Sequence, residues 1–193
     1  MMGQVLVVQA KLDEAMQHYQ EALAILESLG DLQGKSATLH EMAYIHRVRG
    51  DLEGAMDLYR ESLAIKEALG DLQGKAATLH AMAGILTVRG DLEGAMALYR
   101  ESLAIDESLG DLQGKAATLH EMAYIHQVRG DLEGAMGLYR ESLAIDESLG
   151  DLQGKSATLH EMAGILAVRG DLEGAMGFYQ ESLAIDESLG DLQ

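Results

Sequence analysis

The sequence predicts an all-α solenoid of antiparallel helix pairs, on the strength of three observations. The segment Gly-Asp-Leu-Gln-Gly-Lys begins at Gly30 and returns at Gly70, Gly110 and Gly150, a constant spacing that indicates stacked internal repeats. The dipeptide Gly-Asp divides each repeat into two equal halves, each long enough for one helix and its turn. The 193-residue chain has no Pro and is rich in Ala, Leu, Glu and Met, which favour helices. We therefore expect one domain of stacked units.

The repeat period sets the boundaries of the expected repeats. A truncated first repeat occupies residues 1–30, full repeats follow at 31–70, 71–110, 111–150 and 151–190, and residues 191–193 begin another. Leu12 to Met16 align with Leu52 to Met56, so residues 1–9 are expected to be a truncated helix. Both ends look cut and uncapped. We therefore expect end-to-end association between copies of the chain through these ends.

Each half repeat carries the signals of one amphipathic helix. The Gly can close a helix in the left-handed conformation, and the following Asp can accept hydrogen bonds from free amides of the next helix. Apolar residues recur at helical spacing in both halves. In one repeat these positions are Leu39, Met42, Ala43 and His46 in the first half and Leu52, Ala55, Met56, Tyr59 and Leu63 in the second. The methionines are expected to fill the core and not to form a cofactor site.

Composition excludes several classes of function. The net charge of -18 argues against nucleic acid and anionic membranes as partners, because phosphate binding depends on clustered Lys and Arg. The absence of Cys excludes disulfides and a thiolate metal site. The apolar run from Val5 to Val8 is too short for a signal peptide or a spanning helix. We expect a soluble protein without a cofactor, with the cytoplasm as the default compartment.

Acidic residues concentrate in the second helix of each repeat and at the caps. In one repeat they are Asp131, Glu133, Glu141, Asp146 and Glu147. We interpret them as a solvated convex face that keeps the solenoid soluble, and the alternative is a docking surface for a basic partner.

One stretch of the chain resembles the tetratricopeptide repeat family. It comprises Leu119-His120-Glu121-Met122-Ala123, then Gly130-Asp131, then Ala135, Tyr139 and Leu143. The usual Pro after the second helix is missing and each repeat is six residues longer, so this is similar to the 40-residue variant found in Pins- and AGS-type scaffolds and in bacterial regulators. The resemblance covers essentially the whole chain. It implies a right-handed superhelix in which the small Ala123 and Ala135 let helices cross closely, and a concave groove that binds a peptide or protein segment.

The resemblance also implies which residues line this groove, because the first helix of each repeat faces it in the family. The candidate residues are His40, Tyr44, Arg47, His80, Gly84, Gln113, Ala117, His120, Tyr124, Gln127, His160 and Gly164. The histidines form a ladder of one per repeat. We interpret them as polar lining or packing, with direct ligand contact as the alternative. A shared metal is not expected, because helices pack about 8 to 10 Å apart and zinc needs nitrogen ligands at about 2.0 Å.

A longer period, equal to two repeats, is superimposed on the single one. Tyr44 and Tyr124 alternate with Gly84 and Gly164. The tyrosines are either aromatic anchors opposite openings left by the glycines, or substitutions that arose by sequence drift and were preserved by duplication. His46 and His126 occupy the positions of Leu86 and Leu166, and for these two histidines we expect core packing.

The segment Gly-Asp-Leu-Gln-Gly-Lys-Ser at residues 30–36 and 150–156 invites comparison with a phosphate-binding loop. That motif has four residues between Gly and Gly-Lys, whereas only three stand here and no strand precedes them. Ala76 and Ala116 replace the Ser in the other repeats. We interpret the segment as a junction between helices.

Two functions remain open at this point. The first is a protein-interaction scaffold that holds a peptide in the groove. The second is a structural or self-assembling array, natural or designed, without a specific ligand, which near-identical repeats favour: residues 111–150 and 151–190 differ at only six positions. An enzyme is not expected, because no Ser/His/Asp, paired-acid or metal constellation stands apart from the repeat.

Overall fold

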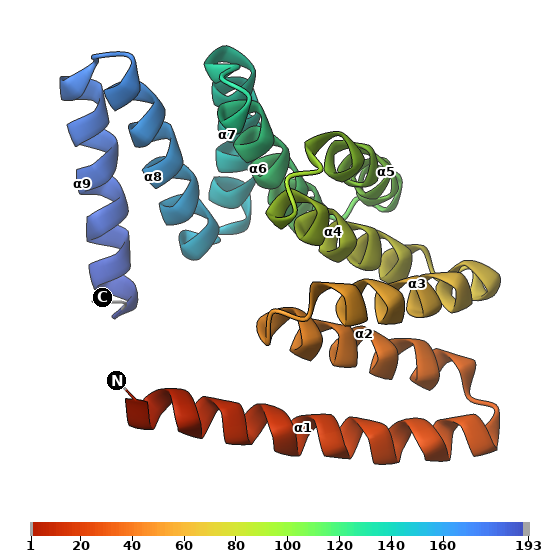
Figure 1. Cartoon of the computed structure of the whole chain (residues 1–193). Helices are drawn as coiled ribbons and strands as arrows, with labels where there is room; N and C mark the ends of the chain where they lie inside the picture. The colour runs from red at the N-terminus through yellow and green to blue at the C-terminus, as the bar shows by residue number, and fades with distance from the viewer. Residues whose placement is uncertain (1, 191–193) are drawn as a thin grey trace. The chain divides into compact units, whose positions relative to one another are not determined.

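The computed structural model describes residues 2–190, which form nine α-helices (Figure 1). The chain divides into two compact units, Met1–Asp91 and Leu92–Gln193. The first unit contains α1 (Met2–Leu29), α2 (Leu32–Val48), α3 (Leu52–Leu69) and α4 (Leu72–Val88). The second contains α5 (Leu92–Leu109), α6 (Leu112–Val128), α7 (Leu132–Leu149), α8 (Leu152–Val168) and α9 (Leu172–Leu189). The predicted all-α fold of helix pairs is confirmed, and residues 191–193, expected to begin a further repeat, lie outside the described residues.

The Gly-Asp junctions stop one helix and start the next, as predicted. Gly30 takes the left-handed conformation at φ 68°, and Asp31 accepts a hydrogen bond at 2.9 Å from the amide of Gly34. A Cβ atom at Gly34 would lie 2.5 Å from Cδ2 of Leu26 and 2.7 Å from the carboxylate of Asp31. Glycine is therefore favoured there because the preceding helix and the capping carboxylate both approach its backbone closely, and no phosphate is needed to explain it.

The first helix differs from the expectation in one respect. Residues 1–9 were expected to form a truncated helix before the one aligned with Leu52 to Leu69, but α1 runs without a break from Met2 to Leu29. Ala10 and Lys11 stand where later repeats have Gly and Asp. Neither residue supplies a left-handed stop or an N-cap, so the helix continues through this point.

The cores lie where a second helix packs against the first helices beside it. In the second unit α7 packs against α6 and α8, and the buried Ala123 and Ala135 leave room for this close packing. The cluster there is Ala123, Ala135, Met136, Tyr139, Met162 and Ile165. In the first unit a corresponding cluster contains Met16, Met42 and Ile45. The expectation that the methionines fill the core is confirmed for Met42 and Met56, which are buried.

The first helices of neighbouring repeats also touch each other, α2 against α4 and α6 against α8. The exposed sides of these helices consequently form one continuous face within each unit, which we call the first-helix face. No helix within residues 2–190 is long and apolar enough to cross a membrane.

Candidate functional site

The first-helix face brings most of the predicted groove residues to the surface. On α6, Gln113, Ala117 and Tyr124 are exposed and His120 and Gln127 are half-buried; on α8, His160 is exposed and Gly164 is half-buried. In the first unit the corresponding residues are His40, Tyr44 and Arg47 on α2 and His80 and Gly84 on α4. The residues that the family resemblance implies for the groove therefore share one side of each first helix.

Gln127 connects three helices of the second unit through its side-chain amide. The Tyr139 hydroxyl of α7 donates to its oxygen at 3.2 Å, and its nitrogen donates to Glu161 of α8 at 3.3 Å. A buried tyrosine is thus linked to a carboxylate on the first-helix face. This chain of hydrogen bonds fixes the positions of groups that would otherwise rotate freely at the surface.

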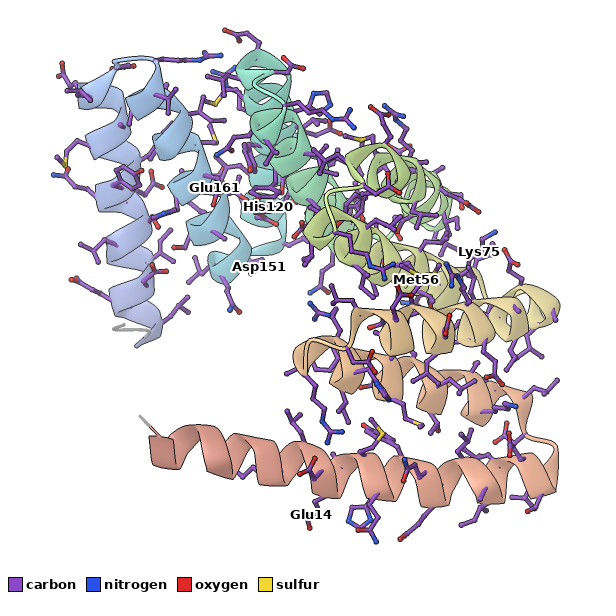
Figure 2. All side chains as sticks on the ribbon, viewed as in Figure 1. Glu14, Met56, Lys75, His120, Asp151 and Glu161 are labelled. Atoms are coloured by element: carbon purple, nitrogen blue, oxygen red, sulfur yellow. The ribbon has the colours of Figure 1, made fainter. Side chains whose placement is uncertain are left out.

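Two carboxylates on this face, Glu121 and Glu161, were not predicted. Neither is among the candidate residues named from the sequence. Both are half-buried, and both lie close enough to His120 to raise its pKa against the larger lowering effect of burial. Figure 2 labels His120 on α6 and Glu161 on α8. The sequence does contain a signal, the dipeptide His-Glu at 40–41, 120–121 and 160–161.

The ladder histidines are packed into the face by neighbours on two other helices. His120 Nδ1 lies 3.1 Å from the hydroxyl of Thr158, and its ring meets Tyr139 edge-on with centroids 5.1 Å apart. His40 has the same surroundings, with Thr78 at 3.2 Å and Tyr59 at 4.9 Å. Burial, with a smaller contribution from the Lys66 charge, lowers the pKa of His40 to about 4, and burial also lowers the pKa of His120. Both rings are neutral at pH 7.

The two repeated tyrosines are the largest exposed groups on the face. Tyr44 is 46% and Tyr124 is 42% exposed. The guanidinium of Arg47 lies 5.0 Å from the centre of the Tyr44 ring, a cation–π contact. A Cβ atom at Gly164 would meet only the Tyr179 hydroxyl, at 3.7 Å, so α8 leaves room there. Aromatic anchors that alternate with openings stay a prediction.

The two units differ in the charge they place on this face. Arg47 in the first unit stands where Gln127 stands in the second. The Arg47 cation lies near the Tyr59 hydroxyl, whereas burial, followed by the charges of Glu161 and Glu121, raises the pKa of the Tyr139 hydroxyl. The face of the second unit is rich in hydrogen-bond acceptors. Within residues 2–190 no group of three or more His, Asp or Glu is placed to hold a metal ion.

The expectation that His46 and His126 pack in the core is wrong. Each is half-buried, and its Nδ1 lies 2.7 Å from the carboxylate of the next N-cap, Asp51 or Asp131. The pKa of each aspartate is lowered, first by the amide of Gly54 or Gly134 and then by this histidine. A leucine side chain at this position can only pack against its neighbours, whereas the imidazole can form a polar contact with the aspartate five residues later.

Asp146 was expected on the solvated convex face, and this is also wrong. Asp146 and its equivalents Lys66 and Asp106 are each buried. Lys66 donates to the Thr78 hydroxyl at 2.9 Å, and Asp146 is hydrogen-bonded to Thr158. In three of the four full repeats this position therefore holds a buried charge beside a threonine of the next helix.

Paired antiparallel helices that repeat at a constant spacing and offer one shared face define the class of α-helical repeat proteins. The model of the tetratricopeptide repeat family matches residues 1–68, 34–108, 74–148 and 114–188. The chain belongs to this family, and the resemblance found in the sequence is confirmed.

Solved structures of the same fold have little sequence in common with this chain. The chain is similar to BtubC (BKLC) from P. vanneervenii, with 19% identity and a TM-score of 0.82 over 96% of this chain and 77% of that one. It is similar to aspartyl phosphate phosphatase F from Bacillus subtilis, with 16% identity and a TM-score of 0.86 over 95% of this chain and 50% of that one. It is similar to a Rap protein complexed with Competence and Sporulation Factor, with 20% identity and a TM-score of 0.83 over 98% of this chain and 53% of that one.

The chain thus spans about half the length of the latter two proteins. A sequence search of curated proteins found no match.

Proposed function

We propose that this protein is an interaction scaffold that holds a peptide or protein segment against its first-helix face. The observation that carries the proposal is the exposed ring of Tyr124 beside the buried Tyr139. The Tyr139 hydroxyl is bonded to Gln127 and lies near the carboxylates of Glu161 and Glu121, and its ring contacts His120. A rigid aromatic side chain contributes contact area at a small entropic cost. The solved Rap protein complexed with Competence and Sporulation Factor supports the proposal by analogy of fold.

Charge indicates what kind of segment this face accepts in the second unit. Glu121 and Glu161 supply acceptors, and a chain of hydrogen bonds runs from Glu161 through Gln127 to Tyr139. A bound segment with Lys or Arg side chains complements this charge. No covalent step is proposed, because the hydroxyls of Thr78 and Thr158, which lie beside His40 and His120, are buried and out of reach of a bound segment.

The test is a selection of peptides from a displayed random library on the immobilised protein. The selected peptides are expected to contain Lys or Arg and to lose binding to the variant Tyr124→Ala with His120→Ala. A matched control variant, Arg100→Ala with Arg140→Ala, changes exposed residues of α5 and α7 and is expected to bind as the parent does. Undiminished binding to the Tyr124 and His120 variant refutes the proposed face.

A further inference from the structure

His120 uses only one of its two ring nitrogens inside the protein. Its Nδ1 lies 3.1 Å from the hydroxyl oxygen of the buried Thr158. Its Nε2 is hydrogen-bonded to none of the described residues, and within residues 2–190 no buried side-chain nitrogen or oxygen lacks a partner. Nε2 is therefore accessible at the first-helix face. A neutral imidazole has a proton on one nitrogen and a lone pair on the other, so the state of Nδ1 decides whether Nε2 donates or accepts at the surface.

A carboxylate below the surface determines where the proton of Thr158 points. Asp146 of α7 is 4% exposed, and its carboxylate accepts a hydrogen bond from the Thr158 hydroxyl. An ionised carboxylate can only accept hydrogen bonds, and a hydroxyl has a single proton to donate. Because Asp146 takes that proton, the Thr158 oxygen can only accept from His120. Nδ1 then carries the imidazole proton, and Nε2 holds the lone pair.

The first unit has the same hydroxyl beside a charge of opposite sign. Lys66 donates to the Thr78 hydroxyl at 2.9 Å, so the buried charge leaves the Thr78 proton free for another acceptor. Two acceptors are within reach, the carbonyl of Gly74 at 2.8 Å and Nδ1 of His40 at 3.2 Å. The Lys66 charge also acts on His40, and a cation disfavours a proton on the nitrogen that faces it. No anion therefore holds His40 with its proton on Nδ1.

We propose that Asp146 is a positioning residue that acts through Thr158 to hold the proton of His120 on Nδ1, so that Nε2 accepts a hydrogen bond from the segment bound at the first-helix face. Nε2 then adds a third acceptor to the carboxylates of Glu121 and Glu161. Three acceptors on one face match the N–H donors of Lys and Arg side chains. The role in binding rests on the proposed function, whereas the position of the proton does not.

The position of the proton is measured by NMR on the ¹⁵N-labelled protein, because correlations of the ring protons with Nδ1 and Nε2 distinguish the two tautomers. Burial raises the pKa of Asp146 to about 6 and lowers the pKa of His120. At pH 8 the carboxylate is therefore ionised and the ring is neutral. We expect the proton of His120 on Nδ1. A proton on Nε2 in the parent protein overturns the proposal.

Two substitutions of Thr158 test whether its hydroxyl transmits the effect. Thr158→Val removes the hydroxyl at nearly constant volume and is expected to move the His120 proton to Nε2, because Nδ1–H loses its acceptor while Nε2–H can bond to water. Thr158→Ser keeps a hydroxyl and should keep the proton on Nδ1. Neither variant changes the net charge. The same tautomer in both variants would refute the role of the hydroxyl.

A third variant changes the buried charge itself. Asp146→Lys introduces the residue that the repeat at 31–70 has at this position, and it is expected to raise the population of His120 with its proton on Nε2 by about tenfold. Asp106→Lys makes the same change one repeat earlier, beside Thr118, and should leave the tautomer of His120 unchanged. A purely structural role of Asp146 predicts no change in either variant, and that result overturns the proposal. If Asp146→Lys does not fold, the two Thr158 variants decide.

The role in binding is measured with a Lys- or Arg-containing peptide selected on the parent protein. Asp146→Lys is expected to weaken binding about tenfold, because an N–H at Nε2 of His120 would face the donors of the peptide. Asp106→Lys changes the net charge equally and is expected to bind as the parent does. Equal affinity of these two variants would show that Nε2 is not a contact. If no peptide is selected, the proposed function and the binding role are refuted together, while NMR still decides the position of the proton.

Discussion

Lys66 donates a hydrogen bond at 2.9 Å to Thr78 from a position that is aspartate in the next three repeats. Thr78 also lies 3.2 Å from His40 on the first-helix face. In the second unit, Thr158 stands in the same way between the buried Asp146 and His120. A single hydroxyl therefore connects a charge in the core with a histidine at the surface, and the sign of that charge differs between the two units.

Replacing Lys66 by methionine is expected to stabilise the first unit. Lys66 is 6% exposed, and burial lowers the pKa of its ammonium group because the charged form is poorly solvated there. Methionine fills a similar volume without this cost, and Thr78 keeps its hydrogen bond to the carbonyl of Gly74 at 2.8 Å. We expect Lys66→Met to raise the free energy of unfolding at pH 7 by about 1 kcal/mol or more. Urea denaturation measures the change, and a loss of stability would mean that the Thr78 hydrogen bond outweighs the cost of burying the charge.

The same substitution is expected to raise the pKa of His40. Burial is the main cause of its low pKa of about 4, and the Lys66 charge is the second cause. Removing the cation leaves only burial, so the pKa should rise but stay below 6.5. Because the folded-state pKa is depressed, stability from neutral His40 is present above pH 6.5 and is lost as pH falls toward about 4. Titration of the imidazole resonances by NMR tests this, with His120 as the internal control that Lys66→Met should not change.

The buried aspartates make the opposite contribution to the pH dependence of the second unit. Burial, followed by the charge of Asp151, raises the pKa of Asp146 from 3.8 to about 6. The fold thus favours the protonated acid, whose stabilising contribution is full below about pH 3.8 and is lost as pH rises through about 6. Asp146→Asn is neutral at every pH. The stability gained by this variant over the parent should therefore grow between pH 4 and pH 7, by at most about 3 kcal/mol.

Chemical denaturation of parent and variant at several pH values measures that difference. The comparison matters because neutral His120 loses its contribution as pH falls, in the opposite direction to Asp146. The histidine is common to both proteins, so its effect cancels in the difference. A difference that does not change with pH would show that Asp146 has the same pKa in the folded and unfolded chain.

The sequence predicts the helices and their ends well because their causes are local. Gly-Asp supplies both the stop and the start of each pair of helices, and the structure places Gly30 and Asp31 in those roles. The first helix supports the same rule, since Ala10 and Lys11 replace the dipeptide and the helix does not end there.

The buried charges were missed because the sequence analysis treated every charged residue as exposed. The useful signal was the apolar Leu26 at the same position of the first repeat. The face residues Glu121 and Glu161 were missed for a different reason, because each lies at the border between the buried and exposed sides of its helix, half-buried in both cases. Contacts of that kind depend on how neighbouring helices pack, which helical periodicity alone does not determine.

Gly154→Ala is expected to destabilise the second unit because of the same buried aspartate. A Cβ atom at this position would lie 2.9 Å from the carboxylate of Asp146, which is buried and held by Thr158. The carboxylate must move or the helices must separate. We expect a net loss of about 1 to 3 kcal/mol in the free energy of unfolding, measured by urea denaturation at pH 7.

Gly137→Ala is the matched control, because that glycine lies inside α7 with no atom within 4 Å of an added Cβ. Without a clash, alanine should stabilise the helix by up to about 1 kcal/mol. The clash itself is isolated by combining Gly154→Ala with Asp146→Ala, since shortening the aspartate removes the atoms that the new methyl group meets. The double variant should be more stable than the sum of the two single effects predicts, by about 1 kcal/mol or more. Strict additivity would mean that Gly154 is needed for its backbone conformation and not for the close approach of Asp146.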